Sequence, residues 1–135
     1  MMSRMSRKQH KAHSAQGDHA QAEREQGARR RLMDAGAAAL DPRPWRPSPA
    51  PPSAVDLVQF AVWRHADLSP DDILSALALL PAARAEVEGL ESALLFIARS
   101  AGLTWAQVAQ VMGFNSPQAC QQHFTRLTAR QEAGS

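Results

Sequence analysis

The sequence contains little cysteine, few aromatic residues and no long apolar run. Cys120 is the single cysteine among 135 residues, so no disulfide can form within the chain, which is typical of proteins from a reducing cytoplasm. No stretch approaches the roughly 20 apolar residues of a membrane-spanning helix, and no apolar segment of a secretory signal follows the basic N-terminus. We therefore expect a soluble, cytoplasmic, nucleoid-associated protein with no membrane partner.

Motifs of enzymes and of metal sites are also missing from the sequence. It has no phosphate-binding glycine loop, no nucleophile motif and no Ser/His/Asp set. His10, His13 and His19 lie in a polar segment without paired cysteines, a pattern that does not predict a zinc site. Asp71 and Asp72 are better explained by the positive end of a helix than by acid–base chemistry. We expect no catalytic activity, no cofactor and no metal.

The composition favours an all-α fold, and the charges are unevenly distributed. Alanine is plentiful, whereas there are three Trp, four Phe and no Tyr. Residues 1–46 hold ten Lys/Arg against five Asp/Glu, residues 47–103 hold three against seven, and residues 104–135 hold two against one. A basic N-terminal segment indicates where an anionic partner would bind; the alternative is a disordered tail without a partner.

The chain divides into three segments. Residues 1–40 form a basic arm that we expect to be largely disordered, with a marginal helix over residues 18–40. Residues 41–53 contain six prolines, which predict a semi-rigid, extended linker. Trp45 in this linker is either an anchor that packs on the domain or part of a Pro-rich recognition element. Residues 54–130 then form a helical domain.

Helix start and stop signals divide this domain further. Ser53 is a predicted N-cap, and Ser69-Pro70 begins a second helix. Pro81 either kinks that helix or begins the third, whose apolar residues recur every three to four positions over residues 82–100. The first helix is apolar around most of its circumference, so it is either buried within the domain or paired with a second copy. We favour pairing there, and hence a homodimer.

Residues 104–127 have the pattern of two short helices joined by a tight turn. Thr104 caps the first helix, and Ala109 lets the two helices cross closely. Gly113 can adopt the left-handed conformation of the turn, and Ser116-Pro117 begins the second helix. The residues predicted to face inward are Trp105, Val108, Ala109, Met112, Cys120, Phe124 and Leu127. This arrangement is a helix-turn-helix at the end of a helical bundle.

The outer surface of the second helix suits the major groove of double-stranded DNA. A glutamine can pair with both N6 and N7 of adenine, and threonine or arginine can reach phosphate. The alternative is that the glutamines are only a solvated helix face. The predicted DNA-binding residues are Thr104, Ser116, Pro117, Gln118, Gln121, Gln122, Thr125, Arg126 and Arg130.

Residues 98–127 resemble small helix-turn-helix DNA-binding proteins of actinobacteria. The matching pattern is W-A-x-x-A-x-x-x-G followed by S-x-Q-A, and the likeness extends over roughly residues 69–130. This resemblance implies a helical fold and a regulatory DNA-binding role. The positions that match are Ala98, Arg99, Gly102, Trp105, Ala106, Ala109, Gly113, Ser116, Gln118, Ala119, Phe124, Arg126 and Leu127.

Two departures from the family pattern leave an alternative function open. Pro117 and His123 stand where those proteins often have arginine, so the second helix carries less positive charge. Because phosphate neutralisation supplies much of DNA affinity, the domain alone should bind weakly unless the basic arm or a dimer adds contacts. The alternative is a protein-interaction module that binds RNA polymerase or a sigma factor. On the second helix, Cys120 is expected to be a buried structural thiol rather than a redox sensor.

Overall fold

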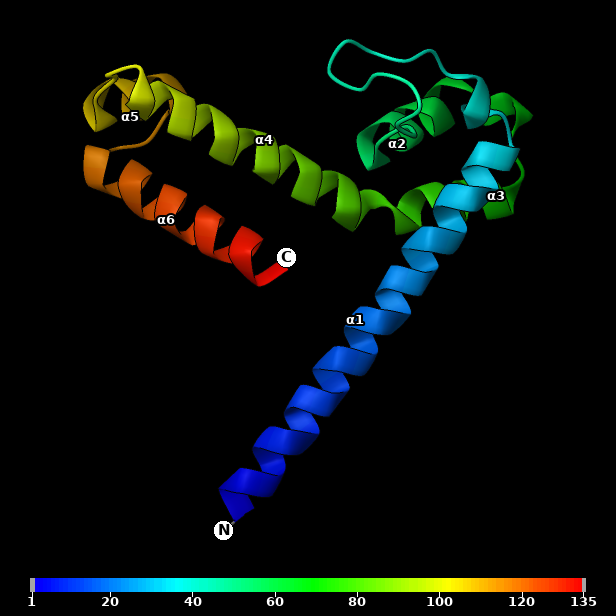
Figure 1. Ribbon diagram of the computed structural model, residues 1–135, viewed down its shortest axis with the longest axis horizontal. Helices are drawn as coiled ribbons and strands as arrows, with labels where there is room; N and C mark the ends of the chain where they lie inside the picture. The colour runs from blue at the N-terminus through cyan, green and yellow to red at the C-terminus, as the bar shows by residue number, and fades with distance from the viewer. Residues whose placement is uncertain (1, 135) are drawn as a thin grey trace. The chain divides into compact units, whose positions relative to one another are not determined.

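The computed structural model describes the backbone of residues 2–134 and the side chains of residues 15–133. The described residues form helices and no strand, so the fold is all-α, as predicted (Figure 1). None of these helices is both long enough and apolar enough to cross a membrane. The elements in chain order are α1 (Met2–Asp34), the short 3-10 helix η1 (Ala37–Ala39), α2 (Ala54–Trp63), the 3-10 helix η2 (His65–Asp67), α3 (Pro70–Ala78), α4 (Leu80–Ser100), α5 (Trp105–Met112) and α6 (Pro117–Gly134).

The chain folds as two compact units, one before and one after the bond between Ala83 and Arg84. This division lies inside α4, whereas the sequence placed the boundary in the Pro-rich segment. The reason is that the end of α1 supplies core residues to the first unit: Leu32 is fully buried together with Leu57 and Leu79. The second unit has its own core on α4, α5 and α6.

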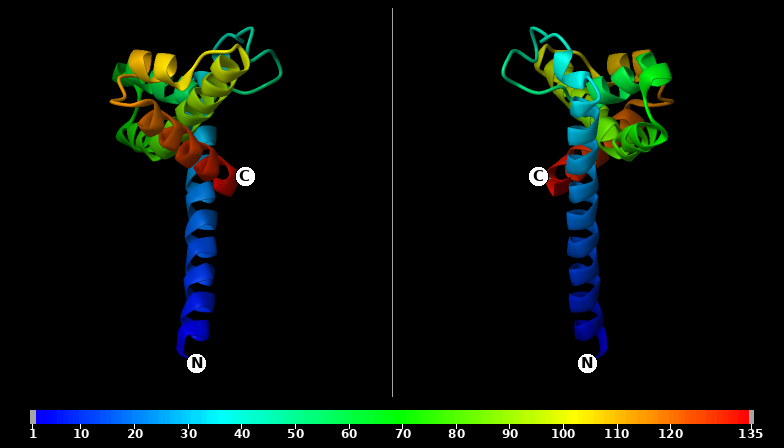
Figure 2. Two further views of the ribbon diagram at one scale, coloured as in Figure 1. Left: turned by 90° about the vertical axis from the view of Figure 1, so that its left-hand side faces the viewer. Right: turned by 90° about the vertical axis from the view of Figure 1, so that its right-hand side faces the viewer.

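The N-terminal arm forms a helix in the structure. α1 runs from Met2 to Asp34 without a break, and Figure 2 shows it as one straight rod. Near its end, Arg31 donates a hydrogen bond to Asp72 at the start of α3, with 3.0 Å between Nε and Oδ1. Such partners from distant parts of the chain stabilise a helix that would be marginal alone. His10 and His13, two of the histidines considered above as zinc ligands, have side chains outside the described residues.

The Pro-rich segment folds back on α2 instead of forming an extended linker. Arg46 forms an ion pair with Asp56, with 2.8 Å between Nε and Oδ2, and its guanidinium also donates to the carbonyl of Asp41. Trp45 is 82% exposed, so the interpretation of this residue as an anchor is wrong. The anchor is Arg46, because the Asp56 carboxylate provides a specific partner that sequence reasoning did not identify.

Local signals place the helix ends where the sequence predicts them. Ser53 and Ser69 each cap a helix, and in both cases a capping box is closed by an aspartate three residues later. Pro81 lies in the first turn of α4, so it begins the third helix rather than kinking the second. The starts of α2 and α3 are therefore fixed by hydrogen bonds between residues three positions apart.

Candidate nucleic-acid interface

The segment α5–turn–α6 is built from short-range hydrogen bonds. At the start of α5, the hydroxyl of Thr104 accepts from the N–H of Gln107 at 3.1 Å, and the amide oxygen of Gln107 accepts from the N–H of Thr104 at 2.8 Å. At the start of α6, the hydroxyl of Ser116 accepts from the N–H of Ala119 at 3.1 Å. Both caps agree with the sequence prediction, and three residues separate the last residue of α5, Met112, from the cap of α6, Ser116.

The turn itself depends on Gly113. This residue has φ 84°, in the left-handed region that favours glycine, and its N–H donates to the carbonyl of Ala109. The two helices then pack closely: Ala109 is 3% exposed, while Cys120 and Leu127 on α6 are fully buried. The rings of Trp105 and Phe124 also pack against each other, with 5.7 Å between their centroids.

Five polar side chains lie together on the outer surface of α6. All five are exposed, and they line one shallow hollow of about 400 Å³. Since Cys120 and Leu127 of the same helix are buried, α6 has one face in the core and one polar face in solvent. The residues of this face, which we call the α6 polar face, are Gln118, Gln121, Gln122, Thr125 and Arg126.

The other predicted binding residues are placed differently. Thr104 and Ser116 use their hydroxyl oxygens as helix caps, and the Thr104 hydroxyl also donates to the amide oxygen of Gln107 at 3.2 Å. Pro117 is exposed at the first position of α6. Arg130 lies four residues after Arg126 on α6, and it forms an ion pair with Glu88 of α4, with 3.4 Å between Nη2 and Oε1. The structure thus brings five of the nine predicted residues onto one surface.

His123 turns away from the α6 polar face. Its Nε2 lies 3.1 Å from Oε1 of Glu91 on α4, and its ring packs on Phe114 at 5.1 Å between centroids. Glu91 also lies close to Cys120, whose pKa is raised first by burial and then by this carboxylate. A thiol with a raised pKa is mostly uncharged and unreactive, which supports a structural role for Cys120.

Two residues of this unit were not assigned correctly from the sequence. Met112 was predicted to face inward, yet it is 39% exposed, because α5 ends there and the chain turns away at Gly113. Arg99 was matched only as part of the family pattern. In the structure its guanidinium lies 5.0 Å from the ring centroid of Trp105 and donates to the carbonyl of Leu103 at 2.6 Å. Arg99 therefore holds the corner between α4 and α5.

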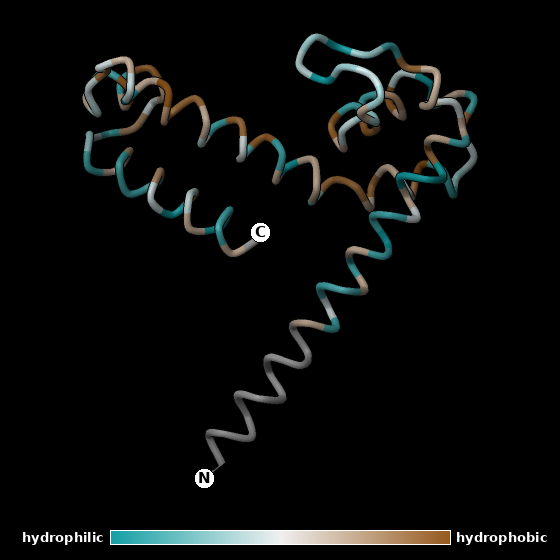
Figure 3. The backbone as a smooth tube through the Cα atoms, viewed as in Figure 1, coloured by the Kyte–Doolittle hydropathy of each residue, from teal (hydrophilic) through white to brown (hydrophobic). Residues whose placement is uncertain are grey.

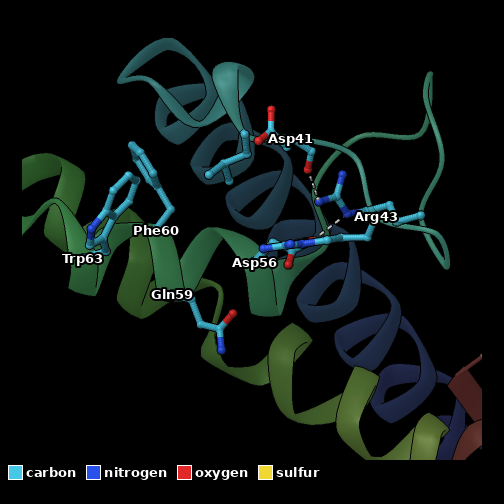
Figure 4. Close-up of a pocket in the computed structure, with 8 residues that line it drawn as sticks. Asp41, Arg43, Asp56, Gln59, Phe60 and Trp63 are labelled. Atoms are coloured by element: carbon cyan, nitrogen blue, oxygen red, sulfur yellow. Dashed lines mark hydrogen bonds and ion pairs between the residues drawn. The ribbon is translucent and has the colours of Figure 1, made fainter.

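The first unit contains a second, smaller polar pocket. Figure 4 shows Asp41, Arg43 and Asp56 at this pocket together with Phe60 and Trp63 of α2. The Asp56 carboxylate is engaged by the cap at Ser53 and by the ion pair with Arg46 described above. The polar residues of this pocket attach the Pro-rich segment to α2. The α6 polar face is therefore the better candidate for a functional site.

Comparison with protein-family models, with curated proteins and with solved structures finds no match to this chain. The geometry of α5 and α6 and the chemistry of their side chains are therefore the observations that bear on function.

Proposed function

We propose that this chain is a sequence-specific transcription regulator that binds double-stranded DNA, with α5 and α6 forming a helix-turn-helix. One observation carries the proposal: α6 buries Cys120 and Leu127 completely while it exposes five polar side chains in a single hollow. In a helix-turn-helix, the second helix lies in the major groove and reads base edges with such side chains. Gln118, Gln121 and Gln122 would read bases, and Thr125 and Arg126 would contact phosphate.

The charge distribution defines how this binding would work. Residues 84–135 hold four Lys/Arg and four Asp/Glu, and Arg130 is already paired with Glu88. Phosphate neutralisation supplies much of the affinity of DNA-binding proteins, so the second unit alone would bind weakly. The basic residues of α1 would supply the missing positive charge. The protein would then act on the nucleoid in the cytoplasm, and it would be a regulator rather than an enzyme.

The decisive test is binding to DNA selected by the protein itself from genomic fragments. Fluorescence anisotropy would compare the full chain with the double variant Gln118→Ala/Gln121→Ala. Because each well-placed glutamine–adenine pair contributes about 1–3 kcal/mol of discrimination, we expect the double variant to lose at least 10-fold in affinity for the selected site. Its affinity for unrelated DNA should change little.

Gln59→Ala is the matched control, since Gln59 is an exposed glutamine on α2 in the other unit. It should leave both affinities unchanged. If the α6 double variant binds the selected site as tightly as the wild-type chain, direct reading of bases by α6 is wrong.

A protein-binding role is the second candidate, and the balanced charge of residues 84–135 favours it. In that case α6 would contact RNA polymerase or a sigma factor. Affinity purification of the full chain, followed by nuclease treatment, would distinguish the two functions. A polymerase or sigma subunit that remains bound without nucleic acid, and that is lost in the α6 double variant, would support the second candidate.

A further inference from the structure

Apolar side chains form an exposed row along α4. Val87, Leu90, Leu94 and Ile97 are each 55–66% exposed, although leucine and isoleucine are usually buried. Figure 3 shows apolar residues recurring along this helix, whereas α6 is predominantly hydrophilic. We call these four residues the α4 stripe.

The spacing of the α4 stripe is that of a helix that pairs with another helix. The steps between its members are three, four and three residues, which is the heptad spacing of coiled-coil seams. A seam of this kind is narrower than the apolar face of a helix that packs on a globular core. Leu95 and Ala98, which lie toward the core of the second unit, are separate from it and are packed within that unit.

The apolar surface continues from the stripe onto α5. Leu103, Val111 and Met112 are 39–85% exposed, and together with Val87, Leu90 and Leu94 of the stripe they line a groove of about 870 Å³ in the second unit. At roughly 60–120 Å² of apolar surface for each side chain of this kind, the seven residues offer several hundred Å². That approaches the about 800 Å² that each partner contributes to a standard protein interface.

We propose that the α4 stripe is the interface with a second copy of this chain, in which the two α4 helices pack antiparallel. The stripe is symmetric about Ser92, so an antiparallel partner places Val87 against Ile97 and Leu90 against Leu94 of the other copy. The inference does not depend on the proposed DNA binding, since it uses only the apolar surface and its spacing. It also places self-association on α4, not on the helix from Ala54 to Trp63, for which the sequence favoured it.

Charges decide between the two orientations. In a parallel pair, Glu86 would face Glu91 of the other copy on both sides of the seam, and like charges there are destabilising. In the antiparallel pair, Glu86 lies beside Ser100 of the other copy. The remaining like-charge approach is between the two Glu91 side chains, so the antiparallel pair has one such approach where the parallel pair has two.

α2 and α3 also expose apolar residues, namely Val62, Trp63, Leu74 and Leu77. These side chains are divided between two helices of ten and nine residues, and neither helix carries a heptad row. Leu57, Phe60 and Ala61 of α2 are already buried within the first unit. The 21-residue α4 is therefore the better surface for pairing with the same helix of a second copy.

The first test measures the mass of the full chain by sedimentation over a range of concentrations. The wild-type chain should be a dimer, and Leu90→Glu/Leu94→Glu should weaken its association at least about 30-fold, as expected when the centre of an interface is lost. Phe96→Glu is the matched control, because Phe96 is 67% exposed on the same helix but lies about 140° around it from the stripe. A monomeric wild-type chain, or equal disruption by both variants at unchanged helical content, would overturn the proposal.

The second test uses a short thiol cross-linker and does not depend on disrupting the interface. Ala93→Cys should cross-link to its own copy near the axis, whereas Ser100→Cys should not, because an antiparallel pair separates the two copies of residue 100 by about 24 Å along the helices. Both positions have the same place in the heptad, so a parallel pair would cross-link equally at both and would contradict the proposed orientation. Cys120 is fully buried, so the wild-type chain provides the background.

Discussion

At the scale of single residues, Gly113 adopts the left-handed conformation of the turn between α5 and α6. Its φ of 84° is unfavourable for any residue with a Cβ, although an added Cβ would meet no atom within 4 Å. The cost of Gly113→Ala is therefore purely conformational, and we expect a loss of about 1 kcal/mol in the free energy of unfolding. Thermal and urea unfolding monitored by circular dichroism would measure it.

Gly27→Ala provides the control with the opposite sign. Gly27 lies inside α1, where a Cβ would also meet nothing within 4 Å, so alanine should stabilise the helix by about 0.5–1 kcal/mol. If both substitutions destabilise the chain equally, backbone conformation is not the cause at Gly113.

Asp56 links stability to pH. Burial tends to raise the pKa of its carboxyl, but the hydrogen bonds from Ser53 and the nearby Arg46 outweigh this and hold the pKa below the ordinary value of 3.8. A lowered pKa in the folded state means that Asp56 contributes stability above pH 3.8, and that this contribution is lost as the pH falls through the lower folded-state value. Asp56→Asn should therefore reduce the drop in melting temperature between about pH 5 and about pH 3.

A second aspartate serves as the control for the pH dependence of the melting temperature in Asp56→Asn. Asp67 is exposed and lies 3.9 Å from Arg64, a geometry that stabilises little in water. Asp67→Asn should keep the pH dependence of the wild-type chain. A pH dependence in Asp56→Asn that equals that of the wild type would show that the attachment of the loop at Arg46 does not contribute.

At the scale of elements, the position of α6 depends on a small core. Leu127 is fully buried beside Cys120 and Val108, so Leu127→Ala removes packed atoms that neighbouring side chains cannot replace. We expect a loss of about 2–5 kcal/mol in the free energy of unfolding of the second unit, measured by urea unfolding. Selected-site DNA binding should fall with it, because the α6 polar face is no longer held in place.

Gln122→Ala separates binding from stability on the same helix. Gln122 is exposed on the α6 polar face, and exposed substitutions usually change stability by less than about 0.5 kcal/mol. Weaker binding to the selected site with unchanged unfolding would assign Gln122 to base recognition. Unchanged binding would remove it from the recognised set.

At the scale of the whole molecule, the basic end of α1 should determine the salt dependence of DNA binding. The positive charges near the N-terminus can be removed by substituting Arg4, Arg7, Lys8 and Lys11. Substitution keeps the core residues Ala28 and Leu32, whereas deletion of residues 1–40 would remove these two core residues as well. Replacing the four cations with glutamine should lower the slope of log affinity against log salt by up to about 3.6 for duplex DNA. An unchanged slope would mean that this end of α1 makes no contact with phosphate.

Local sequence determined most of the helix boundaries. The caps at Ser53, Ser69 and Thr104 and the turn at Gly113 depend on hydrogen bonds between residues at most five positions apart. Their residue types therefore specify them without knowledge of the rest of the fold. The burial of Cys120 and Leu127 and the exposure of the α6 glutamines follow from the same helical periodicity.

Tertiary structure decided which side chains remain available. Arg130 pairs with Glu88 across 42 residues and His123 with Glu91 across 32, so both are turned toward α4 and not outward. Arg46 rather than Trp45 holds the Pro-rich segment, and the apolar row on α4 is left exposed instead of packed inside its unit. The physical reason is the same in each case: spacing along the chain specifies which face of a helix is apolar or polar, but only the folded chain determines what lies opposite that face.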